Sequence, residues 1–159
     1  MIAAIRRMRA NHAWVAVGLW FFASPAFAET SVPGEVLVVL AKEEKGKIDP
    51  QLADLPALRR APFNAFRTME ILSRPQVRLV PGKDTLVNLP NGRRVKLTLQ
   101  QVLADGRYRM KVSINRPDKA DYLPLLQVIA SPGDPFFVAG QSYKGGTLVV
   151  GVRVDSAKK

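Results

Sequence analysis

The stretch RVKLTLQQVLADGRYRMKVSIN, residues 94–115, decides the fold. Apolar side chains alternate with basic or polar ones along both halves, and Asp105-Gly106, a dipeptide typical of tight turns, separates the halves. This period of two predicts an antiparallel hairpin with one buried and one exposed face. Burial of its apolar face would contribute on the order of 10–20 kcal/mol before conformational entropy is subtracted. That face comprises Val95, Leu97, Leu99, Tyr108, Met110, Val112 and Ile114.

The length of the turn sets the expected register of this hairpin. A two-residue turn at Asp105-Gly106 pairs Leu99 with Val112. Both strands then present their apolar residues to the same side of the sheet.

A second hairpin is expected just before it, at Pro90-Asn91-Gly92. A three-residue loop over residues 91–93 would place Leu89 opposite Val95. A two-residue loop would oppose Asn88 to Val95, so the apolar pattern favours the longer loop.

Short strands divided by glycine and proline turns predict the rest of the fold. Together they indicate a mainly β protein, an antiparallel β-sandwich or barrel. One short helix is expected near residues 50–60, because Asp49-Pro50 is a helix-start signal and Pro56 interrupts the helix soon after. We expect it to pack as a lid on a sheet edge or an open end. The further strands are expected at residues 35–42, 65–72, 76–80, 85–89, 122–130, 136–139 and 147–154.

The first residues have the pattern of a secretory signal peptide. A charged start is followed by an apolar run over residues 13–23 and by the small residues Ala26 and Ala28. We expect cleavage after Ala28, with an uncleaved N-terminal anchor as the alternative, because the run is short for a membrane helix. The mature protein is then periplasmic or secreted, with no transmembrane segment after cleavage and a single β domain over residues 29–154. Residues 155–159 would form a disordered tail.

Cleavage would also change the charge and the available chemistry. It would remove Arg6, Arg7 and Arg9 and no acid, so the formal net charge falls from +11 to +8. The chain has no cysteine and its one histidine, His12, lies in the leader. Catalytic systems built on histidine or cysteine, and zinc sites of imidazole and thiolate, are therefore excluded. We expect no catalytic residue, no cofactor and no metal site, and hence no enzyme activity.

The acidic segment NRPDKAD, residues 115–121, is the one place where oxygen ligands for calcium gather. Asn115, Asp118 and Asp121 match no known calcium-loop spacing. The segment is interpreted as a solvated turn.

The exposed side of the central hairpin is strongly cationic. It can be a solvated sheet face, on which lysine and arginine discourage edge pairing. It can also attract an anionic partner, through an encounter that salt would weaken. The residues of this expected basic face are Arg94, Lys96, Arg107, Arg109 and Lys111.

A second candidate surface is LRRAPFNAFR, residues 58–67, which mixes cations with aromatic rings. Such a mixture can bind sugars or single strands by stacking and charge. Nucleic acid is not an expected partner of an exported protein, and Phe63 and Phe66 can equally be core residues. The residues of this expected aromatic-basic patch are Arg59, Arg60, Phe63, Phe66 and Arg67.

Four segments resemble a group of small exported β-proteins of Gram-negative bacteria, myxobacteria among them. They are LPNGRRVKLTL, DGRYRMKVSIN, SPGDPFFVAGQ and YKGGTLVVGVRV. The resemblance spans residues 36–154 and implies an envelope location and a β fold. It implies no catalytic residue.

The leading hypothesis is a non-catalytic accessory or binding component of a cell-envelope assembly for secretion, surface polymer or motility. Its expected partners are an envelope protein or an anionic polysaccharide or lipopolysaccharide, and the oligomeric state stays open. One alternative is a structural subunit that assembles by strand addition, with residues 35–42 or 147–154 as the donor strand. Another is a glycan hydrolase, which would need two carboxylates facing each other across a cleft.

Overall fold

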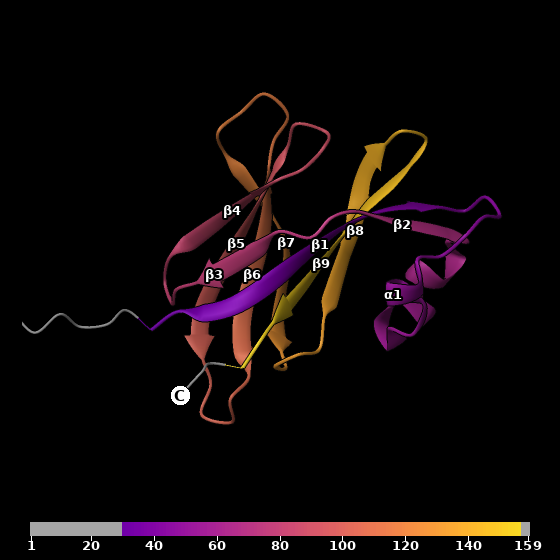
Figure 1. The fold of residues 1–159 in the computed structure, drawn as a ribbon. Coiled ribbons are helices and arrows are strands. Elements are labelled where there is room, and N and C mark those ends of the chain that lie inside the picture. Colours follow the sequence, from indigo (N-terminus) through magenta and orange to yellow (C-terminus); the bar gives the residue numbers. More distant parts are fainter. Residues whose placement is uncertain (1–29, 157–159) are drawn as a thin grey trace, which may run out of the picture.

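The computed structural model describes residues 30–156 as two packed antiparallel sheets and a short helical segment (Figure 1). The chain is mainly β and forms a sandwich, not a closed barrel, which confirms the expected fold class. The strands are β1 (Val32–Lys42), β2 (Thr68–Ser73), β3 (Gln76–Leu79), β4 (Asp84–Asn88), β5 (Arg94–Val102), β6 (Tyr108–Asn115), β7 (Tyr122–Ala130), β8 (Phe136–Tyr143) and β9 (Gly146–Val154). The helical turns are α1 (Pro50–Ala53), η1 (Pro56–Arg59) and η2 (Phe63–Ala65).

A five-stranded sheet has the order β2-β1-β9-β8, with β3 also paired to β1, and a four-stranded sheet has the order β4-β5-β6-β7. Strand β1 lies inside the first of these, and nearly all of its residues are buried. Val36 and Val38 face the core between the sheets, whereas Leu37 and Val39 belong to a second cluster on the opposite face. This explains the continuous apolar run, because a strand covered on both faces needs no polar alternation.

Strands β2 and β3 share one edge of β1. The segment Val32–Glu35 pairs with β3, and the segment Val38–Lys42 pairs with β2. Between the two, the Val36 N–H donates to the Pro75 carbonyl at 2.9 Å. The β2–β3 connection thus continues the ladder along the whole edge.

The helical segment begins where the sequence predicts and covers the outer face of the five-stranded sheet (Figure 1). Asp49 caps α1 by accepting a hydrogen bond from the Gln51 N–H at 2.9 Å, and Pro56 begins η1. Leu52 and Leu58 are buried against the sheet. The expectation of a lid on an edge or an open end is wrong, because a sheet that is apolar on both faces needs a cover on its outer face.

The central hairpin buries the expected face, but its register differs from the prediction. Leu97 pairs with Val112 and Leu99 with Met110, a slip of two residues. The Leu103 N–H donates to the Arg107 carbonyl at 2.8 Å, so the loop has three residues instead of two, which shifts the pairing by one residue. A β-bulge between Leu99 and Gln101 shifts it by one more. A slip of two leaves every side chain on the same face, so alternation alone cannot detect it.

The preceding hairpin shows the same kind of difference. Val87 pairs with Val95, and the Leu89 N–H donates to the Arg93 carbonyl at 2.7 Å. The loop is therefore Pro90-Asn91-Gly92, one residue earlier than predicted. Val87, Leu89 and Val95 are all buried, as expected.

The expected leader, residues 1–28, and residues 157–159 of the expected tail lie outside the described residues. Asp155, at the start of that tail, is held in place: its N–H donates to the Pro33 carbonyl at 2.9 Å, and its carbonyl accepts from the Tyr108 hydroxyl at 3.1 Å. Within residues 30–156, no helix has the length and apolar character that a membrane crossing requires.

Candidate functional site

The outer face of the four-stranded sheet carries four of the five residues expected in the basic face. Arg94 and Lys96 lie on β5, and Arg109 and Lys111 lie on β6. Their sequence neighbours Val95, Leu97, Met110 and Val112 are buried in the core between the sheets. The period of two therefore turns the cations away from that core.

Lys96 belongs to a small polar cluster at one side of this face. Its Nζ lies 3.4 Å from Asp84 Oδ2 and 4.5 Å from the ring centroid of Tyr122. The Thr98 hydroxyl donates to Asp84 Oδ1 at 2.6 Å. This hydrogen bond, together with Lys96 and Lys111, lowers the pKa of Asp84 against the opposing effect of desolvation. Lys96 is thus partly neutralised and serves to join β4 to β5.

Arg107 lies in the loop before β6 and is bound to Asp105, with Nη2 2.7 Å from Oδ2. The Arg107 backbone N–H also donates to Asp105 Oδ1 at 3.0 Å. Hydrogen bonds from the Arg107 side chain and backbone lower the pKa of Asp105. Arg107 therefore closes the loop and contributes little free charge to the face.

Three cations of the basic face are not held in an ion pair, although Lys111 acts on Asp84 from a greater distance. Within residues 30–156, Arg94, Arg109 and Lys111 form no ion pair within 4 Å. Arg109 donates to the Gln101 side chain at 3.2 Å, and this neutral acceptor orients the guanidinium without neutralising its positive charge. We call Arg94, Arg109 and Lys111 the cationic triplet.

The aromatic-basic patch does not form one surface. Phe63 and Phe66 pack against the core beneath the helical segment, and the Phe63 ring meets Phe137 edge-on at 6.0 Å between centroids. Arg59 donates to the Ala53 carbonyl at 3.0 and 3.1 Å and pairs with Asp54 at 3.0 Å. The rings therefore hold the helical segment on the sheet, while Arg60 and Arg67 are exposed.

A buried carboxylate, which the sequence analysis missed, lies on the other sheet. Glu35 on β1 is 3% exposed and accepts hydrogen bonds on Oε1 from Arg74 Nε at 3.0 Å and Gln76 Nε2 at 3.1 Å. Its Oε2 lies 2.9 Å from Arg153 Nη2, an ion pair outside hydrogen-bond geometry. The sequence feature that could have revealed this buried carboxylate is a glutamate inside the otherwise apolar run VPGEVLVVLA.

These partners set the charge of Glu35. Burial alone raises the pKa of its carboxyl, but the hydrogen bond from Arg74 and the positive charges of Arg153 and Arg74 outweigh burial and lower it. Arg74 also donates to the Gln51 side chain in α1. The cluster joins β1, the β2–β3 connection, β9 and the helical segment, which is a structural role.

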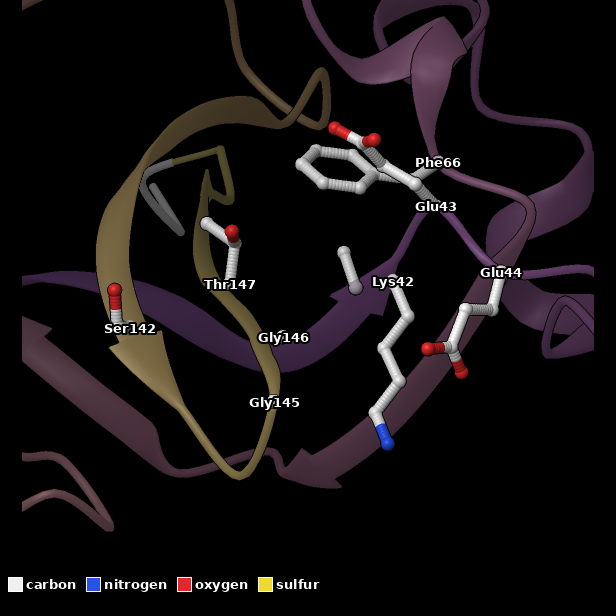
Figure 2. A pocket seen from close by; sticks show the side chains of 9 residues that line it. Lys42, Glu43, Glu44, Phe66, Ser142, Gly145, Gly146 and Thr147 are labelled. Atoms are coloured by element: carbon white, nitrogen blue, oxygen red, sulfur yellow. The ribbon is translucent and has the colours of Figure 1, made fainter.

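An open pocket of about 490 Å³ lies between the end of β1, the helical segment and the β8–β9 hairpin (Figure 2). Phe66 lines it from the helical segment, and Ser142 and Thr147 line it from the hairpin. Its carboxylates, Glu43 and Glu44, are adjacent exposed residues of one loop. They are not the pair of carboxylates, one on each side of a cleft, that glycoside hydrolysis needs.

The acidic segment over residues 115–121 is closed by its own side chains. Arg116 Nε pairs with Asp121 Oδ2 at 2.9 Å, and the Asn115 amide donates to the Arg116 carbonyl at 3.2 Å. Across residues 30–156, His, Cys, Asp and Glu side chains form no group of three or more that could hold a metal ion.

Comparison with protein-family models, with curated proteins and with solved structures gave no match to this chain.

Proposed function

We propose that this protein is a non-catalytic binding component of a cell-envelope assembly, acting in the periplasm or outside the cell. Its outer face on the four-stranded sheet contacts an anionic partner: lipopolysaccharide phosphates, an acidic polysaccharide or an acidic envelope protein. The observation that carries the proposal is the cationic triplet, because among residues 30–156 its charges have no carboxylate within ion-pair distance.

The geometry of the sheet suits this role. Arg109 and Lys111 are two residues apart on β6, so their Cα atoms lie about 7 Å from each other on a rigid strand. Arg94 lies on the neighbouring strand β5, on the same face, four residues from Thr98, which pairs with Lys111. Cations fixed on one face focus the field on a partner and speed its encounter, and salt screens the attraction.

Retention on immobilised heparin, a polyanion, tests the proposal. A variant with Arg94, Arg109 and Lys111 changed to glutamine loses the cationic triplet. A matched control changes Lys45, Arg60 and Arg67 to glutamine, which removes the same charge from exposed positions elsewhere. We expect the first variant to elute at clearly lower salt than the control. Equal elution of both would remove the outer face from the proposal.

Assembly by strand addition remains the alternative. Strands β1 and β9, the expected donors, are hydrogen-bonded on both sides within the five-stranded sheet. Free edges in the described fold belong to other strands, β4, β7 and β8 among them. A mass that grows with protein concentration in light scattering would favour this alternative, and a monomer at high concentration would oppose it.

A further inference from the structure

Strand β7 is an edge of the sandwich that has unusually little protection. It pairs with β6 on one side, and no strand of residues 30–156 is hydrogen-bonded to its other side, although β8 approaches it. It contains no charged residue over Tyr122–Ala130. Of the seven exposed large apolar side chains in the described part of the chain, three lie on it: Leu123, Leu125 and Ile129, at 38%, 39% and 45% exposure. Natural sheet proteins usually guard such edges with charges, bulges or proline.

Two other edge strands, β8 and β4, carry such guards. Strand β8 is interrupted by a bulge between Ala139 and Gln141, and Arg93, just before β5, binds Gln141. Strand β4 is short and begins with Asp84, and its Thr85 hydroxyl donates to the Arg78 carbonyl of β3 at 3.2 Å.

On β7, protection is confined to the first half. Pro124 lies there, beside a bulge in the pairing with β6. The second half, residues 126–130, pairs regularly with β6 and contains neither a proline nor a bulge. An extended chain can therefore add along residues 126–130.

The surroundings of this half specify what the added chain must look like. On the outer face, Gln127 lies beside Lys111 and Ile129 lies beside Arg109, two members of the cationic triplet. A strand added to β7 would lie about 10 Å from β6, so carboxylates on its outer face could meet these two long side chains.

The inner side of the added chain meets an apolar surface. Leu126 and Val128 are half-buried and pack on the core between the sheets. Beside them, Leu125 of β7 and Val138 of β8 line a narrow crevice at this side of the sandwich. Apolar side chains on the added strand would cover this crevice and extend the core.

We infer that residues 126–130 of β7 accept an extended segment of an acidic envelope protein, in which apolar residues alternate with aspartate or glutamate. This rests on the proposed function and names the partner of the same face. A second copy of the chain is a poorer occupant: β7 has no acid to meet Arg109 and Lys111, and pairing two copies through β7 would bring their cations onto one face.

Blocked peptides of alternating valine and glutamate, or valine and lysine, serve as probes. Amide hydrogen exchange of the whole protein reads out edge pairing. We expect the glutamate peptide to protect amides in residues 126–130 and to bind about tenfold tighter than the lysine peptide, a difference of about 1.4 kcal/mol. Equal binding of the two peptides, or protection elsewhere, would overturn the inference.

N-methylated peptides separate edge pairing from simple attraction to the cations. In a strand, successive N–H groups point to opposite edges, so methylating every valine or every glutamate removes the donors of one edge only. We expect one isomer to lose binding and the other to keep it. If both isomers bind equally and binding still requires Arg109 and Lys111, the inference fails and the proposed function stands. If neither heparin nor the peptide depends on these residues, both fail.

Two matched variants complete the test. Ile129→Glu puts a carboxylate beside Arg109 and should abolish binding of the glutamate peptide. Leu86→Glu makes the same change at a similarly exposed position on β4, 50% against 45%, and should leave binding unchanged. Equal loss in both variants would overturn the inference, and so would a dimer that Ile129→Glu dissociates.

Discussion

The two sheets of this sandwich use their outer faces in opposite ways. In the five-stranded sheet, the outer face bears Leu37, Val39 and Val149 and is covered by the helical segment. In the four-stranded sheet, the outer face bears arginine and lysine and meets solvent. The strands show the difference directly, since β1 is buried almost throughout whereas β5 alternates over its first half.

This difference separates an outer face that is occupied by packing from one that is exposed. Apolar contacts occupy most of the outer face of the five-stranded sheet, and its charged residues Glu35 and Arg153 are bound to each other. The cationic triplet of the four-stranded sheet takes no comparable part in the core. Substitutions on the first outer face should therefore alter stability, and those on the second should alter binding.

The largest effect is expected from aspartate placed at adjacent positions of each sheet. Val38→Asp and Val39→Asp should both prevent folding, because an unpaired charge is buried on either face of β1. In β6, Met110→Asp should do the same, whereas Arg109→Asp should cost no more than about 1 kcal/mol. Folded yield and chemical denaturation measure this. A stable Val39→Asp protein would show that the helical segment does not seal the outer face.

A smaller effect is expected from Glu35→Gln, which keeps the shape of the side chain and removes its charge. Losing the charged partner of Arg74 and Arg153 should lower the free energy of unfolding by about 2–3 kcal/mol near neutral pH. Both arginines are more than one-third exposed, so water limits the loss.

The same substitution should change the dependence of stability on pH. The pKa of Glu35 is lowered in the folded protein, so its contribution is complete above the ordinary carboxyl pKa of about 4.3 and is lost as pH falls through the folded value. The free energies of unfolding of the wild type and Glu35→Gln, measured by chemical denaturation at several pH values from neutral to roughly pH 3, should therefore converge as the pH falls. A difference between the two proteins that stays constant with pH would mean that Glu35 is not the titrating group.

The smallest effect is expected from Gly151→Ala, on the outer face of the five-stranded sheet. A Cβ at this position would lie 2.5 Å from Cε1 of Phe137, so the ring must move. We expect a loss of about 1–2 kcal/mol. Adding Phe137→Leu to Gly151→Ala should recover part of it, and a double-mutant cycle measures the coupling. Additive losses would show that the ring is not the obstacle.

The sequence predicted the faces of the strands better than their registers. Alternation correctly placed Leu97, Met110 and Val112 in the core, because period two follows from backbone geometry. Register depends on whether a loop takes two or three residues. The bulge after Leu99 adds a second one-residue shift to that of the longer loop, so the apolar residues stay on the core face.

The position of the helical segment could not be predicted in the same way. Asp49-Pro50 and Pro56 correctly indicated a short, interrupted helix. The run of β1 showed that both of its faces are buried, but not which layer covers each of them. The Glu35 cluster was missed for a related reason: its partners come from residues 74, 76 and 153, which only the tertiary fold brings together.

Of the candidate binding residues, four of the five hairpin cations lie on one face as predicted, because alternation alone determines this, and Arg107 lies in the loop before β6. The sequence did not predict which of these cations form ion pairs with carboxylates. Lys96 and Arg107 have carboxylate partners, and only the strand pairing that brings Asp84 beside Thr98 explains the first of these.

The pairing of β1 with β9 has a consequence for the order of folding. Val36 lies beside Val152, so the middle of the larger sheet is made of segments from opposite ends of the described chain. Contacts between residues so distant in sequence form slowly, since a long loop must close first. A newly synthesised chain thus cannot complete this sheet until its last strand has left the ribosome.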